Sequence, residues 1–163
     1  MKKVTLIRLV SLLLMLALMI GIFVLSGQNA EESGNLSSGL TYRLFCLFYP
    51  HFLAKTPPQQ DVLMSGFETL VRKAAHFSLY FALGAVAFVV YITYQKMSLR
   101  WRCAFPIFTG VLYAVSDEIH QLFIAGRSCE FRDVMIDSCG VVLACFLALW
   151  IYQKMIRKKE RKK

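Results

Sequence analysis

The sequence predicts a single all-α membrane domain over residues 1–163 with about four transmembrane helices, and three observations support this fold class. Hydrophobic residues make up 57% of the 163 residues and gather in blocks of about 20, the length that crosses a hydrocarbon core of roughly 30 Å. A soluble domain of this size exposes too much of its surface to bury several wholly apolar helices. Basic residues are frequent in the segments that would lie on one side of the membrane and sparse in those on the other side, as in polytopic membrane proteins.

The predicted transmembrane spans are followed by a basic tail over residues 153–163. The spans cover residues 5–25, 74–94, 103–125 and 134–152. The first span follows the basic residues Lys2 and Lys3, and a secretory signal likewise has a basic region before its apolar region. However, the apolar segment here is long for a signal peptide, and no convincing cleavage site follows it. We therefore expect it to be retained as a transmembrane helix.

The longest segment outside the spans, residues 26–73, separates the first two spans. It opens with a polar, turn-prone stretch over residues 26–33. An apolar stretch over residues 40–54 is too short to cross the membrane, so we expect it to lie along the outer interface or to re-enter the membrane shallowly. Residues 55–58 contain two prolines that should end any helix there, and a new helix is expected to start near Asp61.

The basic residues predict that both termini lie in the cytoplasm. Lysine and arginine are enriched in cytoplasmic loops, and only six of the nineteen fall on the opposite, outer side: Arg43, Lys55, Arg72, Lys73, Arg127 and Arg132. The basic tail is expected to lie against anionic lipid. We expect no nucleic-acid partner despite the net charge of +9, because the basic run has no interleaved aromatic residues.

The five cysteines show no CxxC spacing, which argues against a zinc finger or a thioredoxin-like motif. Cys46 and Cys129 both fall on the outer side, where a disulfide between them is an open alternative. Cys103, Cys139 and Cys145 are expected to be small apolar residues within helices.

Polar and ionisable residues gather near the outer ends of the second, third and fourth spans. A charge inside a span costs roughly 2.5–3.5 kcal/mol at the membrane centre, so this concentration predicts an outward-facing polar pocket. Its candidate binding residues are Arg72, Lys73, His76, Tyr80, Asp117, Glu118, His120, Gln121, Arg127, Asp133 and Asp137. Ion pairs that only fix helix packing would explain two or three charges, and we favour a functional site because so many groups are present.

Helical periodicity places these residues on shared faces of three helices. In the second span, one face of the helix carries Lys73, His76, Tyr80 and Gly84. In the fourth span, Asp137 and Gly140 lie on the same side of the helix. We expect both glycines to permit close helix contact. Asp117 shares its helical face with His120 and Gln121, which follow at i+3 and i+4. We expect Asp117 to lie about 12 Å below the outer boundary of the membrane.

These motifs resemble those of the VanZ-like family of small bacterial membrane proteins. The matching pieces are residues 26–28 (SGQ), 72–76 (RKAAH) with Tyr80, 83–84 (LG), 117–121 (DEIHQ), 126–127 (GR), Asp133, Asp137 and Gly140, and their order and spacing agree over roughly residues 20–150. The resemblance implies a multi-pass protein of the bacterial plasma membrane and cell envelope. It also implies a link to resistance to the glycopeptide teicoplanin, with which the founding member is associated. It implies no reaction, because the biochemical activity of the family is not settled.

Three functions are open. The first is a non-transporting envelope protein whose pocket binds a lipid-linked or cell-wall group. The second is a membrane-embedded enzyme that acts on a lipid headgroup or phosphate ester, with Asp117 or Glu118 and His120 as acid and base and Arg127 on the phosphate, although no recognised catalytic motif supports it. The third, a proton- or ion-coupled carrier, is disfavoured because the inner halves of the spans are apolar and no internal repeat is present.

The expected partners are the lipid bilayer and, in the first hypothesis, a lipid-linked or cell-wall precursor; a homo-oligomer is compatible with the sequence. No cofactor is predicted. A divalent metal held by Asp117, His120 and Asp133 or Asp137 is an open alternative. His51, the remaining histidine, falls in the outer segment and is expected to play no part in the site.

Overall fold

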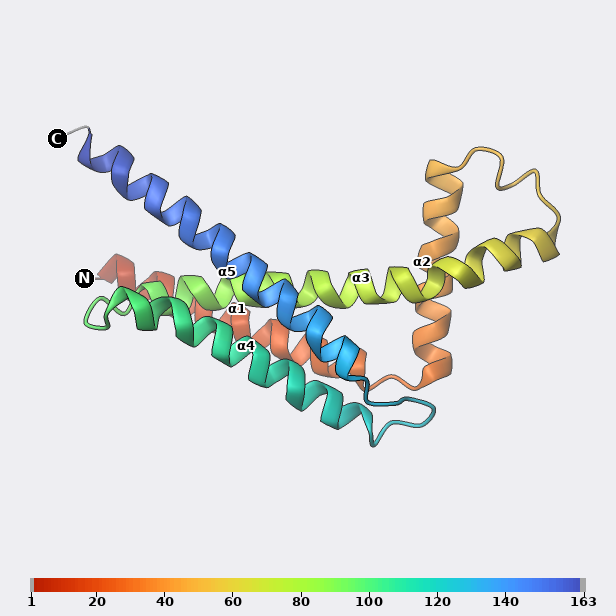
Figure 1. Ribbon diagram of the computed structural model, residues 1–163, viewed down its shortest axis with the longest axis horizontal. Coiled ribbons are helices and arrows are strands. Elements are labelled where there is room, and N and C mark those ends of the chain that lie inside the picture. The colour runs from red at the N-terminus through yellow and green to blue at the C-terminus, as the bar shows by residue number, and fades with distance from the viewer. Residues whose placement is uncertain (1, 162–163) are drawn as a thin grey trace.

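Five helices make up the part of the chain that the computed structural model describes, residues 2–161 (Figure 1). They are α1 (Lys2–Ser26), α2 (Ala30–Phe48), α3 (Pro57–Ile92), α4 (Leu99–Gln121) and α5 (Phe131–Glu160). No strand occurs among these residues, so the all-α prediction is confirmed. The last two lysines of the basic tail, Lys162 and Lys163, lie outside the described residues.

Three helices are long and apolar enough to cross a membrane, namely α1 over Lys3–Ser26, α3 over Pro57–Ile92 and α5 over Phe131–Glu160. The helix α4 is not among them, because charged residues lie near both of its ends. It nevertheless packs beside α3 and α5, and its 23 residues reach about 35 Å at 1.5 Å per residue. The chain is therefore a polytopic helical membrane protein, and the fourth span stays a prediction.

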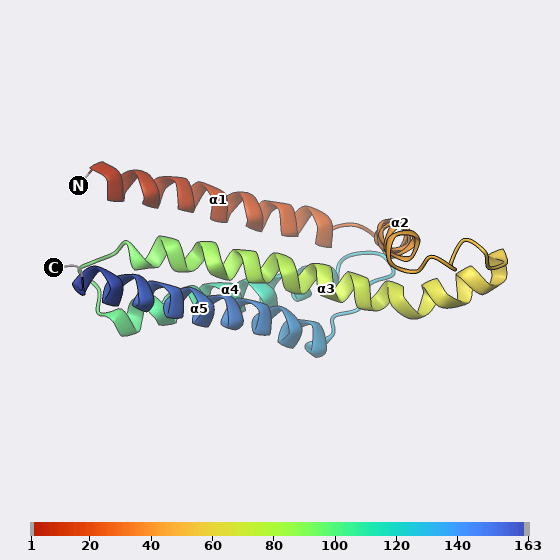
Figure 2. The same ribbon diagram turned by 90° about the horizontal axis from the view of Figure 1, so that it is seen from above.

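The central helix is α3, which packs against each of the other four helices. Figure 2 shows it between α1 on one side and the pair α4 and α5 on the other. Its most extensive interface is with α5, and the two glycines expected at close contacts lie there. A Cβ added to Gly84 would lie 2.8 Å from the Cα of Val141, and one added to Gly140 would lie 2.7 Å from the carbonyl oxygen of Phe77. Backbone therefore meets backbone at this crossing, as predicted.

The hydrophobic core lies along this crossing and supports the polar end of the bundle. Tyr80 and Leu83 of α3 pack with Ala114 of α4 and Val141 of α5, and all four side chains are buried. From α1, Ile22 contributes a buried side chain. These contacts hold the middle of α3 against α1, α4 and α5, next to the region where the sequence concentrates charge.

The outer segment between α1 and α3 is more helical than the sequence predicted. The helix α2 begins at Ala30, within the stretch expected to be turn-like, because Asn29 and Glu32 cap it reciprocally. The side chain of Asn29 accepts a hydrogen bond from Glu32 N at 2.9 Å, and the Glu32 carboxylate accepts one from Asn29 N at 3.3 Å. Figure 1 shows α2 lying across the long axis of the other helices, and its place along the interface stays a prediction.

The helix break predicted near the two prolines of the outer segment is confirmed, because no helix covers residues 49–56, and the prolines themselves start the next helix. Pro57 and Pro58 occupy the first turn of α3, after Thr56 as N-cap. Proline fits there because its missing N–H would have no intrahelical partner. The helix therefore begins before the predicted start at Asp61 and continues without a break to Ile92.

The third predicted span ends earlier in the structure. The helix α4 stops at Gln121, and residues 122–125 form turns that lead to Gly126, whose φ of 74° lies in the left-handed region that favours glycine. Asp117 is therefore about 6 Å from the end of its helix at 1.5 Å per residue, not the roughly 12 Å that a helix reaching residue 125 would give, and its depth in the membrane stays a prediction. The acidic residues lie nearer to the end of the bundle than the sequence indicated.

The cysteines are all free in the described chain, so the open alternative of a Cys46–Cys129 disulfide is not realised between residues 2 and 161. Cys145 is buried in the core and Cys103 is half-buried, as expected for small apolar residues within helices. Cys139 is exposed on α5.

Candidate functional site

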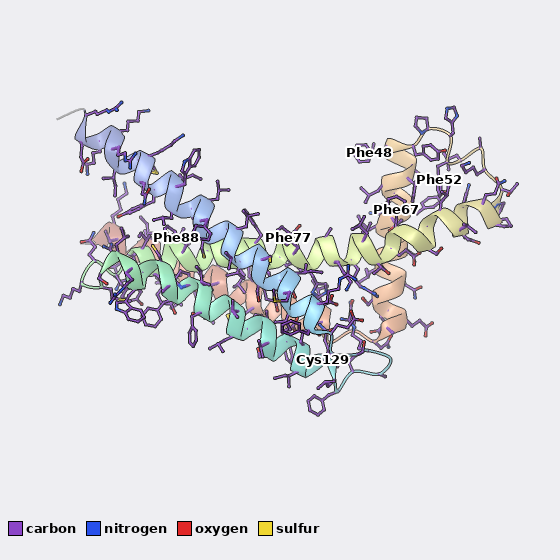
Figure 3. All side chains as sticks on the ribbon, in the orientation of Figure 1. Phe48, Phe52, Phe67, Phe77, Phe88 and Cys129 are labelled. Carbon is purple, nitrogen blue, oxygen red and sulfur yellow. The ribbon has the colours of Figure 1, made fainter. Side chains whose placement is uncertain are left out.

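A polar pocket lies where α3 meets the C-terminal end of α4 and the N-terminal end of α5. Its cavity of about 110 Å³ is bordered on one side by residues 122–130, the loop that joins α4 to α5; Figure 3 labels Cys129 in this loop. Eight of the eleven predicted site residues line the cavity: Arg72, Lys73, His76, Glu118, Gln121, Arg127, Asp133 and Asp137. The side chains come from three helices and a loop, so only the packing of the bundle brings them together.

The rim of the pocket carries an ion-pair cluster that joins α3 to α5. The ammonium group of Lys73 pairs with Asp133 and also lies 3.4 Å from Glu130 Oε2. Glu130 is the N-cap residue of α5 and Asp133 belongs to its first turn, where the helix dipole favours negative charge. Glu130 was not among the predicted site residues, although it stands three residues before Asp133 and so on the same side of the helix start.

A chain of hydrogen bonds holds the loop of residues 122–130 to α4. Glu118 is buried; its Oε2 accepts from Glu130 N at 3.1 Å and its Oε1 accepts from Gln121 Nε2 at 3.2 Å. Gln121 Oε1 in turn accepts from Arg127 Nη1 at 3.0 Å. Glu118, near the end of α4, therefore positions Arg127 of the loop through Gln121.

One nitrogen of the Arg127 guanidinium is available to bind a ligand. Its Nη2 atom is buried and has no hydrogen-bond partner within the described chain. Burial and the nearby Arg72 lower the pKa of Arg127, but a guanidinium stays charged in a protein. A buried donor of this kind is suited to an anionic ligand, because an anion would satisfy both its charge and its hydrogen-bonding capacity.

Beneath the rim, a histidine and two aspartates from three different helices converge. His76 Nδ1 of α3 lies 3.9 Å from Asp137 Oδ2 of α5. One ligand atom from each of His76, Asp117 and Asp137 lies within 4.8 Å of the other two. Asp117 Oδ2 accepts a hydrogen bond from Ser26 Oγ at 2.8 Å, so the last residue of α1 orients the carboxylate of α4. Ser26 belongs to the family motif at residues 26–28 but was not predicted to be part of the site.

Three predicted site residues do not line the cavity. Tyr80 and Asp117 are buried behind it. His120 faces α1, where its ring stacks on Phe23 with centroids 4.3 Å apart. Asp133 is engaged with Lys73. The predicted metal ligand set of Asp117, His120 and Asp133 or Asp137 is therefore not brought together, and His76 stands with Asp117 and Asp137 in place of His120. The sequence could not show this, because the face that α4 turns to α1 depends on tertiary packing.

The fold and the site together define a polytopic α-helical membrane protein with a buried polar cluster at one end of its bundle. The family model described as VanZ/LLP1 matches residues 11–152, so the chain belongs to the VanZ/LLP1 family. The resemblance drawn from the sequence motifs is thereby confirmed. No curated protein and no solved structure matches the chain significantly.

Proposed function

We propose that the chain is a plasma-membrane protein of the bacterial cell envelope whose pocket binds the phosphate-bearing headgroup of a lipid-linked cell-wall precursor, and that this binding lowers sensitivity to the glycopeptide teicoplanin. The observation that carries the proposal is the unpartnered Nη2 of Arg127 beside a cavity that Arg72 and Lys73 also line. Arginine recognises phosphate well, because its planar donors match phosphate oxygens in pairs.

The size of the pocket favours a headgroup over a whole precursor. Cavities that enclose a drug-sized ligand measure roughly 300–1,000 Å³, whereas this one measures about 110 Å³. A phosphate group with a short polar extension fits that space, and the rest of the ligand would extend into the outer solvent or along the membrane.

An apolar hollow beside the pocket supports a ligand with a hydrocarbon chain. Its volume is about 240 Å³, and it lies between α2 and the first half of α3. It is lined by Thr41, Leu44, Phe45, Phe48, Tyr49, Phe67 and Val71, and Figure 3 labels Phe48 and Phe67 in this part of the molecule. Val71 of the hollow directly precedes Arg72 of the pocket, so a polar and an apolar binding surface adjoin on one turn of α3.

The arrangement of charge supports an outward-facing pocket. Figure 1 places the N-terminus, the connection between α3 and α4 and the C-terminal end of α5 at the end of the bundle opposite the pocket. That end carries Arg8, Lys96, Arg100, Arg102 and the last turn of α5 with Arg157, Lys158 and Lys159. Lysine and arginine favour the cytoplasmic side, so the pocket end would face the cell wall.

The test compares two arginines of the same loop region. Arg127→Gln removes the pocket guanidinium, whereas Arg132→Gln changes an exposed arginine that does not line the cavity. In cells that express each variant at equal levels, we expect wild type and Arg132→Gln to raise the inhibitory concentration of teicoplanin and Arg127→Gln to lose most of that increase. Equal susceptibility with and without the wild-type protein would refute the link to teicoplanin.

A binding measurement separates the ligand from the phenotype. Purified protein in nanodiscs should bind a polyprenyl phosphate, and Arg127→Gln should bind it at least about tenfold more weakly, since a charge-assisted hydrogen bond contributes roughly 1.5–3 kcal/mol. Competition by inorganic phosphate alone would indicate a free anion as ligand. If neither compound binds the wild-type protein, the headgroup proposal is wrong.

A membrane-embedded enzyme is the second candidate, favoured by the cluster of His76, Asp117 and Asp137 beneath Arg127. In a phosphate-ester hydrolysis, one of these groups would take a proton from an attacking water while Arg127 holds the phosphate. His120, which sequence analysis considered as the base, faces α1 instead. Phosphate release from polyprenyl diphosphate should stop in His76→Gln and persist in His51→Gln; no release by the wild-type protein would exclude this reaction.

A further inference from the structure

Three buried oxygen atoms from three helices lack partners at the floor of the pocket. They are Asp117 Oδ1 of α4, Asp137 Oδ1 of α5 and the Tyr80 hydroxyl of α3, and none has a hydrogen-bond partner within residues 2–161. The side chains are 3%, 1% and 0% exposed. Buried polar atoms in native proteins are nearly always satisfied. The Tyr80 hydroxyl can donate to only one of the two carboxylates, so at least one carboxylate oxygen needs a further partner, either a cation or another donor.

The cationic side chains around the cluster do not supply that partner. Lys73 is paired with Asp133 and Glu130 at the rim, and Arg127 donates its Nη1 to Gln121. No ion pair joins a lysine or an arginine to either carboxylate at the floor within residues 2–161, and His76 Nδ1 lies 3.9 Å from Asp137 Oδ2. Two carboxylates that share a buried site cannot both ionise cheaply, unless a cation lies between them.

The geometry suits a small metal ion. Donor atoms about 2.1 Å from one tetrahedral ion lie roughly 3.4 Å apart. His76 Nδ1 and Asp137 Oδ2 are 3.9 Å apart, and all three ligand atoms lie within 4.8 Å of one another. Small side-chain rotations would therefore bring the donors to coordinating distance.

We infer that His76, Asp117 and Asp137 form a binding site for one divalent transition-metal ion, Zn²⁺ or Mn²⁺, at the floor of the pocket. One imidazole nitrogen with two carboxylate oxygens suits these ions, because calcium and magnesium prefer oxygen ligands alone. A three-ligand set leaves at least one position open toward the cavity. Water or a phosphate oxygen would occupy that position.

An outer hydrogen bond already orients one of the ligands. Ser26 Oγ donates to Asp117 Oδ2 at 2.8 Å, which leaves Oδ1 as the free coordinating atom. Hydrogen bonds of this kind are the usual support of metal ligands, and their loss lowers metal affinity by about 10–100-fold. Ser26 is fully buried, so this support depends on α1 packing against α4.

The competing explanation is a proton shared between Asp117 and Asp137, which would also reduce the repulsion of the two carboxylates. It predicts that the purified protein holds no metal ion. The metal proposal does not depend on the lipid ligand proposed above, because metal content is measured on the protein without lipid. Each proposal can therefore fail without the other.

The test measures metal content and affinity. Protein purified in detergent is stripped with a chelator and dialysed against micromolar Zn²⁺ or Mn²⁺, and bound metal is quantified by mass spectrometry. We expect about one ion per chain in wild type and an affinity at least about tenfold lower in His76→Gln and Asp137→Asn. Asp61→Asn is the control, because this exposed carboxylate lies near the start of α3 and does not line the pocket; it should bind about one ion.

Folding of the variants is checked by helical content and by the melting temperature. Added metal should raise the melting temperature of wild type and Asp61→Asn but not that of Asp137→Asn. If the ligand variants fail to fold, Ser26→Ala replaces them and should bind the ion about tenfold more weakly. Wild-type protein without stoichiometric Zn²⁺ or Mn²⁺ would overturn the proposal, as would equal loss of metal in Asp61→Asn and Asp137→Asn.

Discussion

Replacing Gly140 by alanine should destabilise the protein by about 2 kcal/mol more than the same replacement at Gly66, since overpacking a tight contact costs about 1–3 kcal/mol. A Cβ on Gly140 of α5 would lie 2.7 Å from the backbone oxygen of Phe77 on α3, whereas ordinary contacts begin at 3.4 Å. The two helices would have to separate by about 0.7 Å. Backbone cannot rotate away as a flexible side chain would, so the strain cannot be relieved locally.

Gly66 is a matched control because it lies within α3 and a Cβ there meets nothing within 4 Å in the part of the chain that the structure describes. Alanine is favoured over glycine inside a helix by roughly 0.5–1 kcal/mol, and this gain applies to both replacements. The difference between the two variants therefore isolates the cost of opening the α3–α5 crossing. It also reaches the site, because Phe77 follows His76 and Gly140 lies one turn after Asp137.

The assay is equilibrium unfolding in mixed micelles, followed by the fluorescence of Trp101 and Trp150. Gly66→Ala should match or slightly exceed the stability of wild type, and Gly140→Ala should fall below it. Metal affinity at the floor of the pocket should fall together with stability in Gly140→Ala only. Equal unfolding free energies for the two variants would refute the argument that backbone contact at this crossing determines the packing.

Three further predictions concern the loop, the buried carboxylate and the orientation of the chain. Replacing Ser26 by alanine removes the hydroxyl donor of buried Asp117, and we expect a loss of about 1–3 kcal/mol in the free energy of unfolding. Replacing Glu118 by glutamine weakens the hydrogen bond that Glu130 N donates to it, so the amides of residues 122–130 should exchange about tenfold faster in hydrogen-exchange mass spectrometry. In a variant whose only thiol is Cys129, which is exposed, a membrane-impermeant maleimide should label intact cells.

Each of these predictions has a control with a defined outcome. Ser116→Ala changes an exposed serine that bonds only to its own helix, at Tyr113 O; a loss of stability as large as that of Ser26→Ala would contradict the prediction. Glu31→Gln, in the first turn of α2, should leave exchange of the loop unchanged. A variant whose only thiol is Cys103, near the opposite end of α4, should be labelled only after the membrane is permeabilised; labelling in intact cells would reverse the proposed orientation.

Much of the helical architecture could be predicted from local sequence. Runs of apolar residues predict the cores of α1, α3 and α5, because a helix that crosses lipid needs about 20 of them whatever surrounds it. The stripe from Lys73 to Gly84 was also predictable, since helical periodicity alone decides which residues share a face. Helix starts were predicted less well. The cap formed by Asn29 and Glu32 begins α2 earlier than its polar composition suggested, because reciprocal hydrogen bonds outweigh the turn preference of the individual residues.

The sequence by itself determined that this is a helical membrane protein of the VanZ/LLP1 family with its polar residues near one end of the spans. Only the tertiary structure decided which of those residues meet. It turned His120 toward Phe23, placed Ser26 on Asp117, and brought His76 to Asp137. The physical reason is that the rotation and separation of helices follow from packing between elements distant in the chain, above all the glycine contacts of α3 with α5, and no periodicity within one helix encodes them.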